Sequence, residues 1–124
     1  MSLPRLPALF ILMAGLFGLA GVALAAAAAH GTDARLLGGA SAMCLAHAPA
    51  LIGLAFAADR LRLARLAGAA LALGTAVFAG DLVLRHVAGH GLFPLSAPTG
   101  GVLMMAGWLM TAIGGALALL RGTA

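Results

Sequence analysis

Most of the polar amino acids are missing from this chain of 124 residues, which contains no Lys, Glu, Asn, Gln or Tyr. Charged residues make up only 8%, against roughly 25% in an ordinary soluble domain, so a water-soluble fold could not cover its surface. The single cysteine, Cys44, excludes an intramolecular disulfide and a metal site built from several cysteines. Because Glu is absent and the Asp residues are dispersed, we do not expect ordinary hydrolase chemistry, and we predict no catalytic residue, no metal site and no enzyme activity.

What remains is strongly hydrophobic, at 64% of the residues, and it falls into four apolar runs. The runs cover residues 6–29, 36–58, 66–88 and 99–120. At about 1.5 Å per helical residue, each is long enough to cross a hydrocarbon core of roughly 30 Å. We therefore predict an all-α fold, an integral membrane four-helix bundle with up-down-up-down order, which forms one transmembrane domain over residues 1–124.

The first run has an alternative interpretation as a cleaved secretory signal. Arg5 precedes it, and the alanines at 25–29 offer small residues for cleavage. Signal peptides normally have a hydrophobic region of about 7 to 15 residues, which is much shorter than this run. The length favours an uncleaved membrane span.

The arginines are distributed unevenly along the chain. Four spans bring both termini and the connector 59–65 to one side of the membrane, and that side collects Arg5, Arg60, Arg62, Arg65 and Arg121. Only Arg35 and Arg85 fall on the other side, so the positive-inside rule predicts that both termini are cytoplasmic. The composition, rich in Ala, Gly, Leu and Arg, is typical of a bacterium and hence of its cytoplasmic (inner) membrane. Because the arginines flank apolar runs, the net charge of +4 indicates membrane topology, and we predict no nucleic-acid partner.

Ionisable residues near the end of the third run form the candidate polar site. Asp81 and Arg85 are four residues apart with the acid first, the better order for an ion pair on a helix. Our interpretation is an ion pair near the membrane interface, with Arg85 extending outward. The alternative is a proton or ion relay, since ionisable residues inside a span often mark such pathways. The complete candidate set is Asp81, Arg85, His30, His47, His86 and His90.

The histidines have two interpretations. His47 lies near the middle of the second span, where we expect an interhelical hydrogen bond to Thr75, Thr111 or the Trp108 indole. The other three lie at helix ends, where a cation complements the helix dipole. Alternatively, two histidines on different spans could ligate a haem, but we expect no cofactor.

Small residues recur on one face of the first and last spans and predict close helix packing. In the first span they are Ala14, Gly18, Gly21 and Ala25. In the last span they are Gly100, Gly107, Thr111, Gly114 and Ala118, with Met104 completing the face. We also assign packing roles to Gly80, Gly101 and Trp108, and we expect Ser96 to cap the last helix.

Several short motifs resemble one family. They are Ala-His-Gly at 29–31, His-Ala at 47–48, Phe-x-Gly at 78–80, Pro-x-Gly-Gly at 98–101 and Ala-Gly-Trp at 106–108. This pattern resembles the domain-of-unknown-function 423 family, small four-helix membrane proteins similar to transmembrane protein 256. The family pattern has Ser-Gly-Ser where this chain has Ala79, Gly80 and Asp81. The resemblance implies a multi-pass membrane protein and brings no established activity or catalytic residue.

The exposed connectors are too short to hold a soluble domain, so we expect a non-enzymatic accessory or scaffold subunit. Its expected partners are the lipid bilayer and either other membrane subunits or a second copy. One alternative is a small transporter, or a proton or ion pathway, that uses Asp81, Arg85 and His47. Another is a haem-binding subunit.

Overall fold

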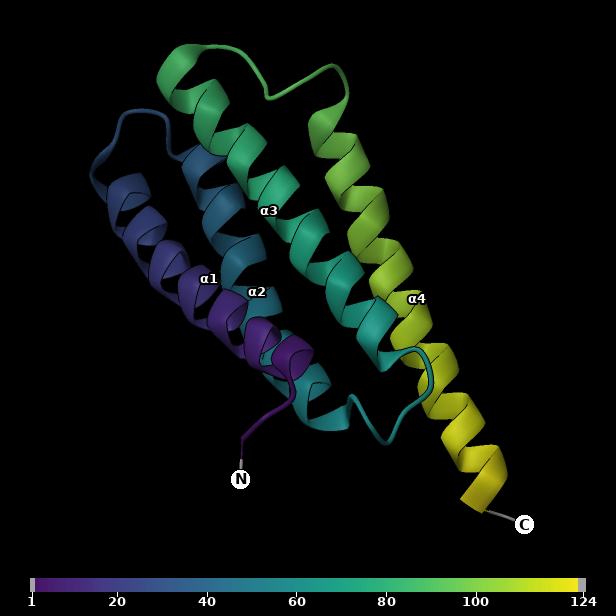
Figure 1. Ribbon diagram of the computed structural model, residues 1–124. Coiled ribbons are helices and arrows are strands. Elements are labelled where there is room, and N and C mark those ends of the chain that lie inside the picture. Colours follow the sequence, from purple (N-terminus) through teal and green to yellow (C-terminus); the bar gives the residue numbers. More distant parts are fainter. Residues whose placement is uncertain (1, 123–124) are drawn as a thin grey trace.

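The computed structural model describes residues 2–122, which form four helices that run alternately up and down (Figure 1). The helices are α1 (Arg5–His30), α2 (Ala34–Ala57), α3 (Ala64–Ala88) and α4 (Ser96–Gly122). Residues 2–122 contain no strand, and all four helices are long and apolar enough to cross a membrane. The predicted all-α, four-helix membrane fold is therefore confirmed.

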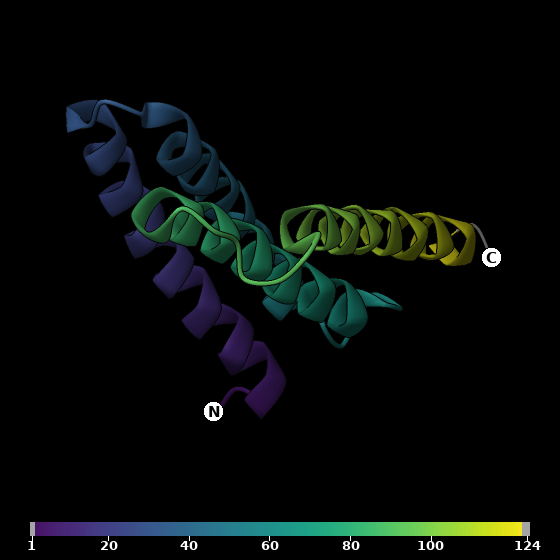
Figure 2. The ribbon, with the colours of Figure 1, turned by 90° about the horizontal axis from the view of Figure 1, so that it is seen from above.

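The helices are arranged as an open row. α1 lies along α2, α2 along α3, and α3 along α4, whereas α1 and α3 approach each other at only a few positions. No described Cα atom of α4 lies within 8 Å of one in α1 or α2. Figure 2 shows α4 directed away from the first two helices. The bundle is consequently open, and within residues 2–122 α3 is the only helix against which α4 packs through its backbone.

The predicted small-residue face of α4 is the surface that packs on α3. Its buried residues are Ser96, Gly100, Met104, Gly107 and Gly114. A Cβ atom on Gly100 would lie 2.7 Å from the backbone nitrogen of Phe78, and one on Gly107 would lie 2.6 Å from Cδ2 of Leu71. The absence of side chains at these glycines thus sets the distance between the two helices.

The prediction for α1 is only partly right. Ala14 and Gly21 are buried, and a Cβ on Gly21 would lie 2.6 Å from Cγ of Leu45. Gly18 is wrongly assigned, since no neighbouring atom lies within 4 Å of where its Cβ would be. The buried face also contains Phe10 and Phe17. The face of α1 that packs on the core is therefore defined by these two rings together with small residues, and not by small residues alone.

Two other predicted packing glycines differ from expectation. Gly101 has no neighbour within 4 Å of its Cβ position, because it lies about 100° around the helix from Gly100. Gly80 makes only an ordinary contact, with Cδ1 of Leu92 at 3.5 Å from its Cβ position. Conversely, Gly68 of α3 packs directly against the ring of Phe10, and a Cβ there would overlap the ring. This is where α1 reaches α3.

Adjacent glycines of α4 provide a matched test of the α3–α4 packing. Gly100→Ala should destabilise the protein by about 1 to 3 kcal/mol, because its methyl group meets backbone atoms that have no rotamer with which to adjust. Gly101→Ala should be neutral or stabilising by up to about 1 kcal/mol, since alanine is the better helix former. Unfolding in mixed micelles, followed by circular dichroism, measures both. Equal effects of the two substitutions would contradict the close approach.

Candidate polar site at the end of α3

Asp81 is completely buried although it is charged. Its Oδ2 accepts a hydrogen bond from Nε of Arg85, one helical turn later, at 2.7 Å. Its Oδ1 accepts one from the backbone N–H of Leu92 at 2.9 Å and a second, short one from the hydroxyl of Ser96. Both carboxylate oxygens are therefore occupied, by donors from α3, from the following loop and from α4.

The Asp81–Arg85 pair has the geometry expected from the sequence. The Arg85 side chain is 43% exposed, whereas that of Asp81 is 0% exposed. A long arginine can keep its head group near water while it pairs with an enclosed acid. The ion pair thus joins a buried acid inside the span to a partly exposed arginine near the end of α3.

Ser96 joins the loop to the start of α4. Its Oγ lies 2.8 Å from the carbonyl oxygen of Phe93 and also beside Asp81, so its single proton is shared between two acceptors. The backbone N–H of Phe93 in turn donates a hydrogen bond to Oγ of Ser96 at 3.4 Å. The expectation that Ser96 precedes and caps the helix is wrong, because α4 begins at Ser96 itself and the hydroxyl is directed to the carboxylate.

Gly91 provides the space in which this arrangement closes. A Cβ there would overlap Oδ1 of Asp81 and lie 2.7 Å from Nη2 of Arg85. Gly89 ends α3 with a φ of 79°, a left-handed conformation that glycine adopts readily, and its N–H bonds to the carbonyl of Arg85. The role of Gly91 was not predicted from the sequence. The available signal was a second glycine two residues after the one that ends the helix.

His47 forms a second polar contact, in the middle of the membrane spans. Its Nδ1 lies 2.8 Å from the carbonyl oxygen of Met43, which can only accept, and its Nε2 accepts from the Trp108 indole N–H at 3.1 Å. These partners require a neutral ring with its proton on Nδ1. Three hydrogen-bond partners were expected for His47. The partner in the structure is Trp108, and it is neither Thr75 nor Thr111. The bond links α2 to α4, whose backbones do not approach each other.

The remaining histidines lie apart from both contacts. His30 ends α1, His86 is in the last turn of α3, and His90 is in the loop that follows; all three are exposed. Within residues 2–122 no group of three or more His, Cys, Asp or Glu side chains is placed to hold a metal ion. The structure therefore divides the six candidate residues among the Asp81–Arg85 site, the His47 contact and three separate surface histidines.

Comparison with protein families gives one match. The family model described as Protein of unknown function (DUF423) matches residues 24–101, from the last two turns of α1 to the second turn of α4. The matched segment includes His47, Asp81 and Ser96, and the resemblance inferred from the sequence motifs is confirmed. No curated protein and no solved structure matches the chain.

Two aspartates allow the contribution of the buried site to be measured against a surface pair. Asp81→Asn should destabilise the protein by about 2 to 3 kcal/mol, because an amide nitrogen replaces an oxygen that accepts from buried donors. Asp59→Asn should lower the free energy of unfolding by less than about 1 kcal/mol. Asp59 pairs with Arg65 at 2.5 Å, but both side chains are more than half exposed, so water screens the pair.

Both variants remove one negative charge and are compared by unfolding in mixed micelles. If Asp81→Asn is no more harmful than Asp59→Asn, the hydrogen bonds at Asp81 do not hold the α3–α4 loop in place.

Proposed function

Because this chain belongs to the family described as Protein of unknown function (DUF423), which has no assigned activity, we propose a function from its own structure. It is a small, non-enzymatic accessory or scaffold subunit that binds a transmembrane helix of a larger membrane assembly. One observation carries this proposal: an open apolar groove runs between α1 and α3.

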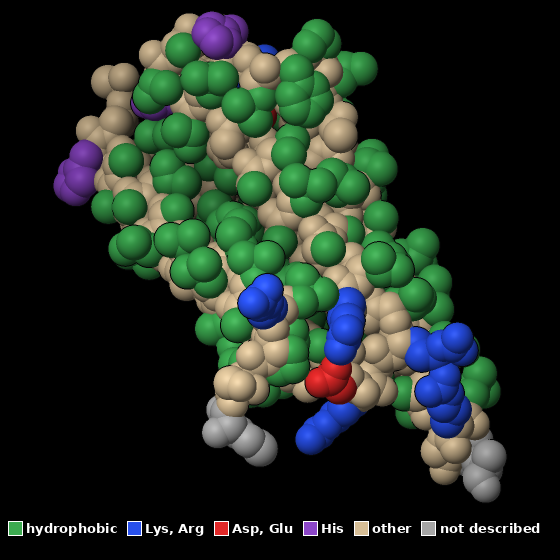
Figure 3. Space-filling model, in the orientation of Figure 1, with side chains coloured by type: hydrophobic (Ala, Val, Ile, Leu, Met, Phe, Trp, Pro, Cys, Tyr) green, Lys and Arg blue, Asp and Glu red, His purple; other side chains and the backbone are tan. Residues whose placement is uncertain are grey.

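The groove consists of two adjoining hollows of about 560 and 360 Å³, which share Met13 and Ala76. No charged residue lines either hollow. Figure 3 shows hydrophobic side chains covering most of the same face of the molecule. The wall formed by α3 consists largely of small residues, namely Ala69, Ala72, Ala76, Ala79 and Gly80. Small residues allow another helix to approach closely, and the groove extends along most of two membrane spans.

The polar side chains support a binding role in a different way. Asp81 and His47 both direct their hydrogen bonds to partners within the chain, so neither offers a free group to the groove. An apolar surface with several small residues along α3 and large side chains along α1 suits recognition by packing. We therefore assign specificity to the shape of the groove and not to charge.

The accessory role is tested by filling the groove. Ala76→Trp places a large ring in the groove. Ala112→Trp on α4 is the matched control, because Ala112 is exposed like Ala76 but does not line the groove. A partner subunit should co-purify in mild detergent with the wild type and with Ala112→Trp, but not with Ala76→Trp. Recovery of the same partner with both tryptophan variants would place its binding site elsewhere, and recovery of the chain as an isolated monomer would argue against the accessory role.

A second candidate function is a small transporter, or a proton or ion pathway, through Asp81, Arg85 and His47. The observation that favours it is the complete burial of an aspartate within a span, a position that is costly and often functional. Among residues 2–122, no hydrogen bond connects Asp81 or Arg85 with His47. Flux across liposomes that is lost in both Asp81→Ala and His47→Ala would establish this function instead.

We further propose that the protein lies in the cytoplasmic membrane of a bacterium with both termini in the cytoplasm. The start of α1, the α2–α3 connector and the end of α4 lie at one end of the molecule (Figure 1). Most of the arginine side chains visible in Figure 3 are at that end, and the histidine side chains visible there are toward the other. An excess of arginine marks the cytoplasmic side.

Reporter fusions test the orientation. Fusions after Arg65 and after Ala124 should both be fluorescent as green fluorescent protein and inactive as alkaline phosphatase, because only the cytoplasm supports the first result. Phosphatase activity at either position would reverse the assignment.

A further inference from the structure

We propose that the chain binds a phosphate group at its basic end, in a pocket between the α2–α3 connector and the last turns of α4. The pocket has a volume of about 210 Å³. It is lined by Arg60, Arg62, Gly114, Leu117, Ala118 and Arg121. Three of these six residues are arginines and none is acidic, so the pocket offers positive charge that no lining residue neutralises.

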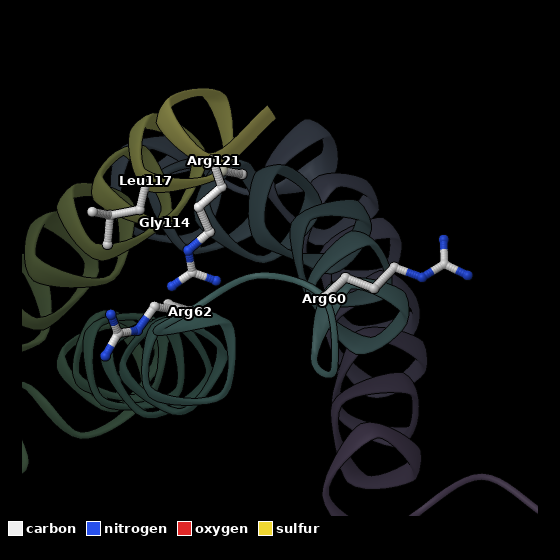
Figure 4. Close-up of a pocket in the computed structure, with 6 residues that line it drawn as sticks. Arg60, Arg62, Gly114, Leu117 and Arg121 are labelled. Atoms are coloured by element: carbon white, nitrogen blue, oxygen red, sulfur yellow. The ribbon is translucent and has the colours of Figure 1, made fainter. Parts of the chain in front are cut away.

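Two arginines that are far apart in the sequence line the same pocket. The Arg121 side chain extends from α4 toward Arg62 of the connector, whereas the Arg60 guanidinium extends in the opposite direction (Figure 4). The nearby Arg65 differs from them, because it is paired with Asp59 at 2.5 Å. In residues 2–122 no carboxylate lies within ion-pair distance of Arg62 or Arg121. Like charges that line one pocket are stabilised by an anion that binds there.

The guanidinium group selects the kind of anion. It presents a planar fork of N–H donors that matches two oxygens of a phosphate, and it stays charged at all physiological pH values. Carbonyl and hydroxyl ligands lack the negative charge that this pocket requires. A phosphate monoester or diester therefore suits Arg62 and Arg121 better than an uncharged ligand.

Gly114 determines how close the two walls lie. A Cβ at this position would overlap the carbonyl oxygen of Arg62, so α4 rests directly on the connector only because residue 114 has no side chain. This backbone contact brings the connector residue Arg62 and Arg121, two turns further along α4, to the same pocket. The position of the two segments that carry these arginines thus follows from a backbone contact.

The position of the pocket favours a phospholipid as the source of the phosphate. It lies where α3 begins and α4 ends, at the boundary of the membrane spans, and Leu117 and Ala118 make part of its lining apolar. Clusters of basic residues next to membrane spans attract anionic lipid head groups. Soluble phosphate has the same charge and the same oxygen acceptors. The pocket shares no lining residue with the groove between α1 and α3, so this inference does not rest on the accessory role.

The experiment measures binding of phosphatidylglycerol and of phosphatidylcholine to the delipidated protein by native mass spectrometry. The paired substitution Arg62→Gln and Arg121→Gln should weaken phosphatidylglycerol binding by about tenfold or more, because both bidentate contacts are removed. The control pair Arg5→Gln and Arg65→Gln removes the same charge at the same end from residues that do not line the pocket, and binding should stay within about twofold of wild type. Phosphatidylcholine has a phosphodiester too, but the arginines repel its quaternary ammonium group, so it should bind weakly to every variant.

Equal weakening by the two pairs would overturn the site, because net charge alone would then explain the binding. A third pair, Arg62→Lys and Arg121→Lys, controls for folding and should bind better than the glutamine pair. Inorganic phosphate identifies the source of the group. If it binds to the wild type and not to the glutamine pair, soluble phosphate is a ligand. If phosphatidylglycerol alone binds in this way, the ligand is the lipid, and if neither binds, the proposal is wrong.

Discussion

A carboxylate buried in a membrane span must find its hydrogen-bond donors within the protein, because the hydrocarbon core supplies none. Asp81 is such a group, and its requirement determines the structure around it. The loop after α3 turns back so that the N–H of Leu92 reaches the carboxylate, Gly91 makes room for the turn, and α4 begins where the Ser96 hydroxyl reaches the same oxygen. The start of the last helix is thereby determined by an acid in the preceding one.

From that point α4 is held almost entirely by α3. Beyond Ser96, Gly100 and Gly107 bring the two backbones together, and Gly114 rests on the connector near its other end. The hydrogen bond from Trp108 to His47 is a cross-connection to α2 in an otherwise open space. Close packing at glycines and a few directional hydrogen bonds thus position α4, whose backbone, within residues 2–122, approaches one helix and one connector.

Hydropathy and helical spacing predicted the parts of this structure that depend on one helix at a time. The four spans follow from the apolar runs, and the pairing of Asp81 with Arg85 follows from a spacing of four residues. The packing face of α4 was also predictable, because its small residues repeat with the period of a helix. In α1 the same reasoning misplaced Gly18, since the rings of Phe10 and Phe17 compete for burial and spacing alone does not show which residues win.

The remaining partners of Asp81 could not be predicted because they depend on the path of a loop. Leu92 contributes a backbone N–H, which every residue except proline has, and Ser96 has several local hydrogen-bonding options that include the expected cap. Only the turn between α3 and α4 determines which of these reaches the acid. The presence of Arg62 and Arg121 in one pocket is likewise a property of the tertiary structure, since nearly half the chain separates them.

The open row of helices also has a consequence for biosynthesis. The most extensive contacts join α1 to α2 and α3 to α4, so the molecule consists of two consecutive hairpins. All the partners of Asp81, which are Arg85, Leu92 and Ser96, belong to the second hairpin. As that hairpin leaves the translocation channel, it carries every donor that its buried acid needs. The charge can therefore enter the lipid already compensated, before the two halves of the protein have met.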